Sequence, residues 1–304
     1  MMKKLLFSSA LTFSSLIATS SVIAGPGEPS AGGLNTINSC NTSVDDCLIT
    51  PTKFSAKVYQ VSLCTSNPMP TSAPPDFEGS GCVDVYKSDT GEETGDIFSD
   101  TGATLSAENI TIPLPGEYTH VATIFDKDFK AASHHMVYSA GGGPVNNKRY
   151  VSTSSGGAIE GAVGDEQMMT GQFNTFMPQI ECQNDASIIK RTATTGNNDT
   201  YKDFLSGGES FYGRILKEDY TLATENVGSI DAGSTAYCAG AKYLLSIVDK
   251  PTTINSNTTG VHVKILAPEG LIRIDQGNGN GVAQGFSTHG SSMAVSVSPI
   301  NSSE

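Results

Sequence analysis

Short runs of alternating apolar and polar residues, separated by clusters of Gly, Pro, Asn and Asp, recur from Lys53 almost to the end of the chain. Alternation of this kind predicts half-buried β-strands, because successive side chains of a strand point to opposite faces. Many short strands with turn residues between them are typical of a sandwich or barrel. The sequence therefore predicts an all-β, mainly antiparallel fold, a β-sandwich or jelly-roll-like structure with few short helices.

Nine strands are expected, and they cover residues 53–63, 109–114, 118–125, 134–139, 210–216, 242–248, 261–266, 271–275 and 292–298. Turns at 114–117 and 267–270 predict two hairpins. In each, proline presets φ at the first central position, and glycine occupies the second central position of the first turn and the fourth position of the second. Helical periodicity is nearly absent. Only 185–191 and 200–205 could form one or two helical turns.

Six cysteines offer three disulfide bonds. No two of them have the close C-x2-C spacing of a zinc site, which makes bound zinc improbable. Six cysteines allow many connectivities, and pairing between sequence neighbours would close local loops without crossing. On that basis the expected disulfide bonds join Cys40 to Cys47, Cys64 to Cys82, and Cys182 to Cys238.

The first 24 residues have the three parts of a secretory signal peptide: Lys3 and Lys4, an apolar stretch over 5–23, and a small residue, Ala24, at its end. A membrane anchor is the alternative, but serine and threonine interrupt the stretch and its core is short for a bilayer span. No other apolar run is long enough to cross a membrane. The sequence thus predicts an exported chain of the periplasm, cell surface or extracellular space, without a transmembrane segment in its mature form. Disulfide bonds persist in such compartments.

The remaining chain divides into three expected parts. Residues 25–52 form a flexible, Gly/Pro/Ser-rich arm with a small cysteine loop, because they contain too few apolar residues to bury a core. Residues 53–144 form an N-terminal β domain, and 145–304 form a C-terminal β domain after a Gly-Gly-Gly-Pro join. A single sandwich with a long excursion is the alternative.

The chain is acidic, with a formal net charge of −13 at pH 7. This charge repels phosphate backbones and anionic headgroups, so nucleic acid is not expected as a partner. It suits divalent cations or a basic partner, and it also keeps an exported protein soluble.

Two histidines and two aspartates form a candidate metal site. If strands 118–125 and 134–139 pair with each other, His120 and His135 approach across the hairpin, with Asp126 and Asp128 in its turn. Imidazole and carboxylate groups are suitable metal ligands. The simpler interpretation is two histidines beside an acidic turn.

Calcium is the ion that several oxygen-rich loops would suit best. None has EF-hand spacing, and Asx-rich loops also form ordinary turns without a metal. The loops contain Asp45 and Asp46, Asp96 and Asp100, Asp126 and Asp128, and Asn197 to Asp199.

No catalytic or cofactor-binding motif meets its structural requirements. The segment 208–213 has one residue too many for a G-x-S-x-G elbow, and 285–289 lacks the closing glycine. The glycine-rich segment 275–281 has no helix pattern after it, as a phosphate-binding loop requires. The sequence therefore favours a non-enzymatic protein. A hydrolase of unrecognised type is the least supported of the functional hypotheses.

The sequence favours a structural or adhesive protein of the cell surface or periplasm, whose arm adds a strand to a neighbouring subunit. Its partners would be further copies of itself or other surface proteins. The alternative is a secreted ligand-binding module, assisted by calcium and directed at carbohydrate. The absence of tryptophan weakens this alternative, although tyrosines could serve as stacking residues; most tyrosines lie in expected strands, as core residues would.

Overall fold

The described part of the chain is almost entirely antiparallel β-sheet, which confirms the predicted all-β class. The computed structural model describes residues 46–49, 51–69, 74–97, 105–106, 109–138, 144–172, 189–192, 210–225, 238–266, 272–275, 285–288 and 294–302. Every strand pair in these ranges is antiparallel. The strands are β1 (Asp46–Ile49), β2 (Lys53–Cys64), β3 (Val83–Glu93), β4 (Gly116–Ala132), β5 (His134–Tyr138), β6 (Pro144–Ser152), β7 (Ala158–Glu160), β8 (Met169–Gln172), β9 (Ile189–Thr192), β10 (Ser210–Leu216), β11 (Thr224–Glu225), β12 (Cys238–Ala239), β13 (Tyr243–Ile254), β14 (Thr258–Leu266), β15 (Ile272–Asp275), β16 (Gly285–Thr288) and β17 (Ala294–Asn301).

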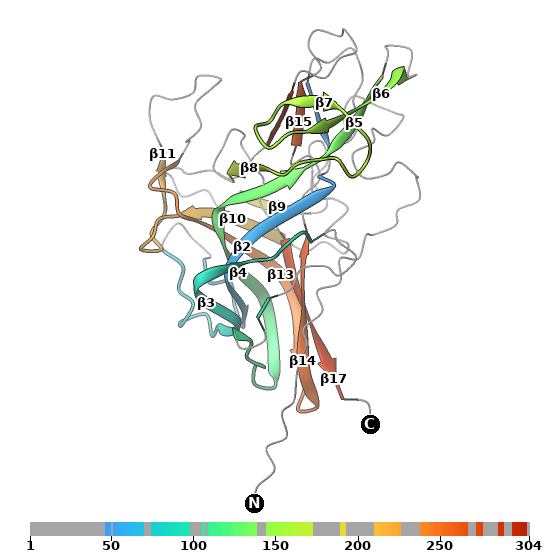
Figure 1. The fold of residues 1–304 in the computed structure, drawn as a ribbon. Coiled ribbons are helices and arrows are strands. Elements are labelled where there is room, and N and C mark those ends of the chain that lie inside the picture. Colours follow the sequence, from blue (N-terminus) through green and yellow to red (C-terminus); the bar gives the residue numbers. More distant parts are fainter. Residues whose placement is uncertain are drawn as a thin grey trace, which may run out of the picture.

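A seven-stranded sheet forms the centre of the fold. Its strand order is β3-β2-β4-β13-β10-β9, and β8 pairs with the last part of β4. The long strands β2, β4 and β13 lie side by side in Figure 1. This one sheet contains strands from both sides of residue 144, the expected domain boundary: β2, β3 and β4 precede it, and β8, β9, β10 and β13 follow it.

The β14–β17 pair covers one face of the central sheet. Its inward side chains are buried in the same core as Leu244 of β13 and Phe125 of β4. Each such apolar side chain contributes about 1.5–3 kcal/mol on full burial. In Figure 1 the pair lies beside β13 at the lower end of the molecule. The inward side chains are Val261, Val263, Ile265, Val295 and Val297.

The connection between β2 and β3 covers the opposite face. Met69, which is 2% exposed, and the partly buried Phe77 pack in a second cluster with Ile124 and Ile247 of the sheet. A disulfide bond between the last residue of β2 and the residue before β3 closes this connection at its base. Both faces of the sheet are therefore covered, as in a sandwich.

Two three-stranded sheets, β5-β6-β7 and β1-β15-β16, lie at the other end of the molecule from the turn between β13 and β14 (Figure 1). A bridge between Gly157 and Gly285 and a 2.7 Å hydrogen bond from the amide of Phe286 to the carbonyl of Gly156 join the two sheets. Gly156 has a φ of 84°, and a Cβ there would lie 2.8 Å from the carbonyl oxygen of Phe286. Glycine is required for this close approach.

Both predicted hairpins are wrong. Residues 111–114 form no strand, although Ile110 makes an isolated bridge to Tyr86, and β4 begins at Gly116. The strands β14 and β15 exist as expected but pair with β17 and with β1 and β16 instead of with each other. Sequence alternation marks the strands, whereas pairing depends on contacts between distant segments.

Two further segments differ from expectation. Residues 189–191 of the candidate helix 185–191 belong to the strand β9. Residues 46–49, within the expected flexible arm, form β1, which pairs with β15. The second candidate helix, 200–205, lies outside the described residues.

Candidate functional site

Three tyrosine side chains from separate segments meet on one face of the central sheet, and we call them the tyrosine cluster. Tyr59 lies on β2, Tyr243 begins β13, and Tyr220 follows β10. The rings of Tyr220 and Tyr243 are nearly parallel, at 14°, with centroids 5.3 Å apart. Tyr59 meets Tyr243 edge-on, with centroids 5.0 Å apart. Both arrangements are favourable for aromatic pairs.

The hydroxyl groups of Tyr59 and Tyr243 remain neutral hydrogen-bond donors at physiological pH. Tyr59 donates a 3.1 Å hydrogen bond to Oδ2 of Asp126. Burial, and then the charge and hydrogen bond of Asp126, raise the pKa of Tyr59 far above its usual value. Burial, with Tyr220 and the carboxylates of Glu218 and Asp126, also raises the pKa of Tyr243. Donors and acceptors are therefore close together in the tyrosine cluster.

A tight loop over residues 217–221 holds Tyr220 in place. The amide of Lys217 donates to the carbonyl of Thr221 at 2.8 Å, and the amide of Tyr220 donates to the carbonyl of Lys217 at 3.1 Å. Asp219 Oδ1 accepts hydrogen bonds from the amide and the hydroxyl of Thr221, at 3.0 and 2.6 Å. An Asx turn of this kind fixes the backbone on either side of the ring.

Two lysine ammonium groups lie beside the rings. Lys57 Nζ is 5.4 Å from the ring centroid of Tyr59, and Lys242 Nζ is 5.9 Å from that of Tyr243. Both distances are within the range of a cation–π interaction. The cluster thus combines flat aromatic surface with charges of both signs.

The structure does not form the hairpin on which the candidate metal site depended. The segment that includes Asp126 and Asp128 is an interior part of β4, at the point where β13 stops pairing with β4 and β8 begins. His135 lies on β5, which pairs with β6. Within the described ranges, no group of three or more His, Cys, Asp and Glu side chains is placed to hold a metal ion.

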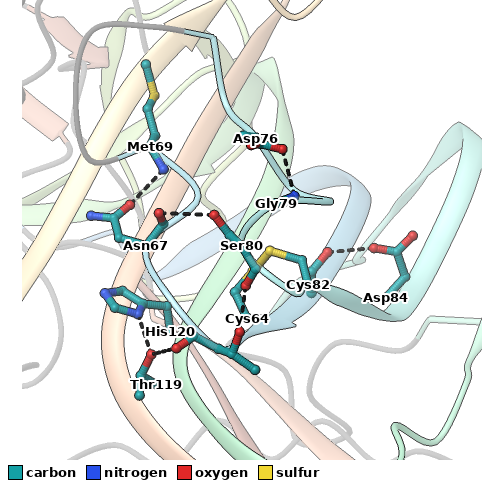
Figure 2. The surroundings of a disulfide bond; sticks show 12 residues. Cys64, Asn67, Met69, Asp76, Gly79, Ser80, Cys82, Asp84, Thr119 and His120 are labelled. Carbon is teal, nitrogen blue, oxygen red and sulfur yellow. Dashed lines mark hydrogen bonds between the residues drawn. A yellow bond between two sulfur atoms is a disulfide. The ribbon is translucent and has the colours of Figure 1, made fainter.

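His120 lies on β4, opposite Cys64 of β2 and Asp249 of β13 in the strand register. Figure 2 shows its ring beside Thr119. Thr119 Oγ1 donates to the carbonyl of Thr65, so it accepts the 2.8 Å hydrogen bond from Nδ1 of His120. Burial lowers the pKa of His120, and the charge of Asp249 partly opposes this effect.

The described carboxylates of the candidate calcium loops already accept hydrogen bonds from the protein. Asp126 Oδ1 accepts one from the amide of Asp128, and Asp128 Oδ1 accepts 2.7 Å hydrogen bonds from Lys127 and Gln172. Asp96 Oδ1 accepts one from the amide of Phe54. The other predicted loop residues, apart from the backbone of Asp46 in β1, lie outside the described ranges.

The expected disulfide bond between Cys64 and Cys82 is confirmed (Figure 2). Inside the loop that it closes, the hydroxyl of Ser80 donates to the carbonyl of Asn67, and Asn67 Oδ1 accepts the amide of Met69. Cys40 and Cys182, members of the other two expected pairs, lie outside the described residues. The backbones of their expected partners, Cys47 and Cys238, belong to β1 and β12.

A buried ion pair near the start of β2 was not foreseen from the sequence. Glu166 Oε1 hydrogen bonds with Nδ1 of His134, and Glu166 Oε2 lies 3.3 Å from Nζ of Lys53. The Glu166 side chain is 2% exposed. Because 53, 134 and 166 are far apart in the sequence, no local pattern could indicate that they meet.

The place of Tyr220 in the cluster was also not foreseen from the sequence. Sequence reasoning assigned tyrosines chiefly to strand cores, which fits the buried Tyr59 and Tyr243. Tyr220 lies instead in the polar turn Lys217-Glu218-Asp219-Tyr220. An aromatic residue in such a polar turn is the feature of the sequence that could have singled it out.

Comparisons with protein-family models, curated proteins and solved structures find no match to this chain. Among the described residues, no helix has the length and apolar character needed to span a membrane.

Proposed function

We propose that this chain is an exported structural or adhesive protein of the cell surface or periplasm, and that it assembles with further copies of itself by strand addition. Two features support export: the signal-like residues 1–24 and the disulfide bond between Cys64 and Cys82. Disulfide bonds are stable in oxidising compartments outside the cytosol.

The observation that carries the assembly proposal is the outer edge of β14. The layer formed by β14 and β17 is two strands wide, and within the described residues β14 has a partner strand on one side only. An edge of this kind can accept a further strand, because its outward N–H and C=O groups can form ladder hydrogen bonds.

The register indicates which groups would accept the added strand. Val261 lies opposite Pro299, which has no N–H, so this pair does not exchange mutual hydrogen bonds. Antiparallel pairs alternate between hydrogen-bonded and non-hydrogen-bonded types. By this alternation, the backbone groups of Val261, Val263 and Ile265 point to the outer side of β14.

The proposed donor is residues 25–41 of a neighbouring copy. This segment has too few apolar residues to form a core of its own, but Leu34 and Ile37 could pack beside the receiving edge. A donor from another copy would convert an edge that invites aggregation into a specific contact.

The test compares the chain from residue 25 to 304 with a variant that lacks residues 25–41. We expect oligomers or filaments from the longer chain and monomers from the variant, measured by light scattering and electron microscopy. A third chain with residues 25–41 in scrambled order is the matched control and should also be monomeric. The same monomeric mass for all three chains would overturn the proposal.

A synthetic peptide of residues 25–41 provides a second measurement. It should bind the shortened variant and raise its melting temperature, because a ligand that binds only the folded state stabilises it. The scrambled peptide should have no effect. If the chain without residues 25–41 assembles as readily as the chain from 25 to 304, the contact between copies does not use residues 25–41, and the proposal is overturned.

A further inference from the structure

We infer that the tyrosine cluster is a glycan-binding site in which the exposed face of Tyr220 stacks against a sugar ring. Tyr220 is 40% exposed, whereas Tyr59 and Tyr243 are 9% and 8% exposed. The two buried rings therefore act as a support, and the third presents its surface to the solvent. A flat aromatic surface suits the C–H face of a pyranose ring.

The backbone of Tyr220 adopts an unfavourable conformation at the position from which the ring is presented. Its φ of 61° makes Tyr220 the one non-glycine residue with positive φ among the described residues. A residue other than glycine in this conformation is strained by roughly 1–2 kcal/mol. Strain of this kind is concentrated at functional sites. A glycine in this turn would avoid the strain but would lose the ring.

The loop presents the ring in a fixed orientation. Asp219 holds Thr221, the ends of the loop are joined by the hydrogen bond from Lys217 to Thr221, and the ring rests on Tyr243. A side chain that is already ordered loses little conformational entropy when a ligand binds. The site is therefore preorganised for stacking.

The surroundings favour a sugar over an organic cation. Rings that recognise a quaternary ammonium group enclose it from several sides, whereas these three rings pack against one another. The ammonium groups of Lys57 and Lys242 already lie beside two of the rings and would repel a further cation.

Sugar hydroxyl groups need both donors and acceptors around the stacking surface, and the cluster has both. The carboxylate of Glu218 is close enough to act on the Tyr243 hydroxyl, and Lys242 supplies a donor. A polar rim around an aromatic centre is the usual composition of a small-ligand site.

This inference does not depend on assembly through β14, because the cluster lies on the opposite face of the central sheet from the β14–β17 pair. Binding is therefore to be measured both on the chain from 25 to 304 and on the variant without 25–41. Glycan binding by both would support this site even if assembly fails.

The probes are three β-linked hexasaccharides: cellohexaose, laminarihexaose and chitohexaose. Saturation-transfer NMR measures which sugar protons approach the protein. We expect at least one probe to bind, with stronger transfer to the axial protons of one ring face than to those of the other. Failure of all three to bind would overturn the inference.

Four variants test the role of the ring. Tyr220→Gly should weaken binding at least about tenfold without lowering the melting temperature, because it removes the ring and the backbone strain together. Tyr220→Asn, which also tolerates positive φ, is the second ring-free variant should glycine impair folding. Tyr220→Phe keeps the stacking surface and should retain binding. Leu114→Ala removes an exposed apolar side chain elsewhere and is the control.

Unchanged affinity in the folded ring-free variants would overturn the inference, as would equal losses in Tyr220→Gly and Leu114→Ala. A loss confined to the ring-free variants, with Tyr220→Phe binding like the wild type, would establish stacking on Tyr220.

Discussion

Glu166 Oε1 lies 2.5 Å from Nδ1 of His134, in a buried contact that links the segment after β7 to the start of β5. The second carboxylate oxygen accepts the amide of Gly164 at 2.8 Å. Lys53 Nζ donates to the carbonyls of Gly164 and Glu166, at 3.1 and 2.9 Å. One glutamate therefore joins three segments of the chain, and its charge is satisfied on every side.

We expect Glu166→Gln to destabilise the protein by about 2 kcal/mol at pH 7, because it weakens a buried, hydrogen-bonded ion pair. Burial alone would raise the pKa of Glu166, but the hydrogen bonds from His134, the backbone and Lys53 lower it below the ordinary value of 4.5. The unfolded chain then binds more protons than the native one in acid. The contribution of Glu166 is present above the ordinary pKa and is lost as the pH falls through the lowered pKa. Urea unfolding of the wild type and Glu166→Gln between pH 3 and pH 7 measures how their difference in free energy of unfolding shrinks in acid.

Glu160→Gln is the control, because Glu160 pairs with Lys148 at an exposed position. Exposed pairs contribute little to stability, so this change should be nearly neutral at every pH. A stability difference between wild type and Glu166→Gln that stays constant down to pH 3 would contradict the assigned role of the carboxylate.

The disulfide bond between Cys64 and Cys82 should hold the β2–β3 connection on the sheet. Its residues are 18 apart in the sequence, and closure of a loop of this size is worth about 3 kcal/mol in the chain-entropy model. We expect Cys64→Ala with Cys82→Ala to lower the free energy of unfolding by about that amount. Proteolysis should then cleave the loop around Met69 faster. Unchanged cleavage and stability would show that Met69 and Phe77 alone hold the loop.

The sequence predicted strands far better than it predicted pairing. The segments 53–63, 134–139 and 210–216 match β2, β5 and β10 closely, because alternation is a local property. The 118–125 segment matched in type but continues to Ala132, since Asp126 and Asp128 find partners in β13 and β8. An acidic pair that looks like a turn can thus lie within a strand where the neighbouring strands change.

The candidate site was the least predictable part. Tyr59 and Tyr243 were correctly seen as strand residues, but the stacking of Tyr220 on Tyr243 depends on the path of the loop after β10. The disulfide bond was foreseen, because a short sequence separation makes Cys64 and Cys82 natural partners. Contacts such as His134 with Glu166 depend on strand order, which no local pattern contains.

Gly171 lies on β8 where this strand packs closely against Thr288 and Phe129. A Cβ at this position would lie 2.5 Å from the Cβ of Thr288 and 2.6 Å from Cζ of Phe129. We expect Gly171→Ala to destabilise the protein by about 2 kcal/mol, within the usual range for overpacking of a core. Gly116→Ala is the control, because a Cβ there meets nothing closer than 3.8 Å. Equal thermal stability of the two variants would contradict the packing.

Glu92 on β3 connects Tyr86 to residues 105–106. Its Oε2 accepts a 3.0 Å hydrogen bond from the Tyr86 hydroxyl, and its Oε1 accepts the amide and the hydroxyl of Ser106, at 2.9 and 2.8 Å. Burial opposes ionisation, but the hydrogen bonds from Ser106 and Tyr86 lower the pKa of Glu92 overall. Its contribution to stability is therefore present above its ordinary pKa and is lost in acid.

We expect Glu92→Ala to cost about 2 kcal/mol at pH 7, because Tyr86, which is 1% exposed, loses a hydrogen-bond acceptor in a buried site. The same change in a Tyr86→Phe background should cost less, since no hydroxyl then needs that acceptor. Urea unfolding of the wild type, both single variants and the double variant gives the coupling energy between the two residues. Additive effects would show that Glu92 acts through its other hydrogen bonds, and that the hydrogen bond to Tyr86 contributes nothing to stability.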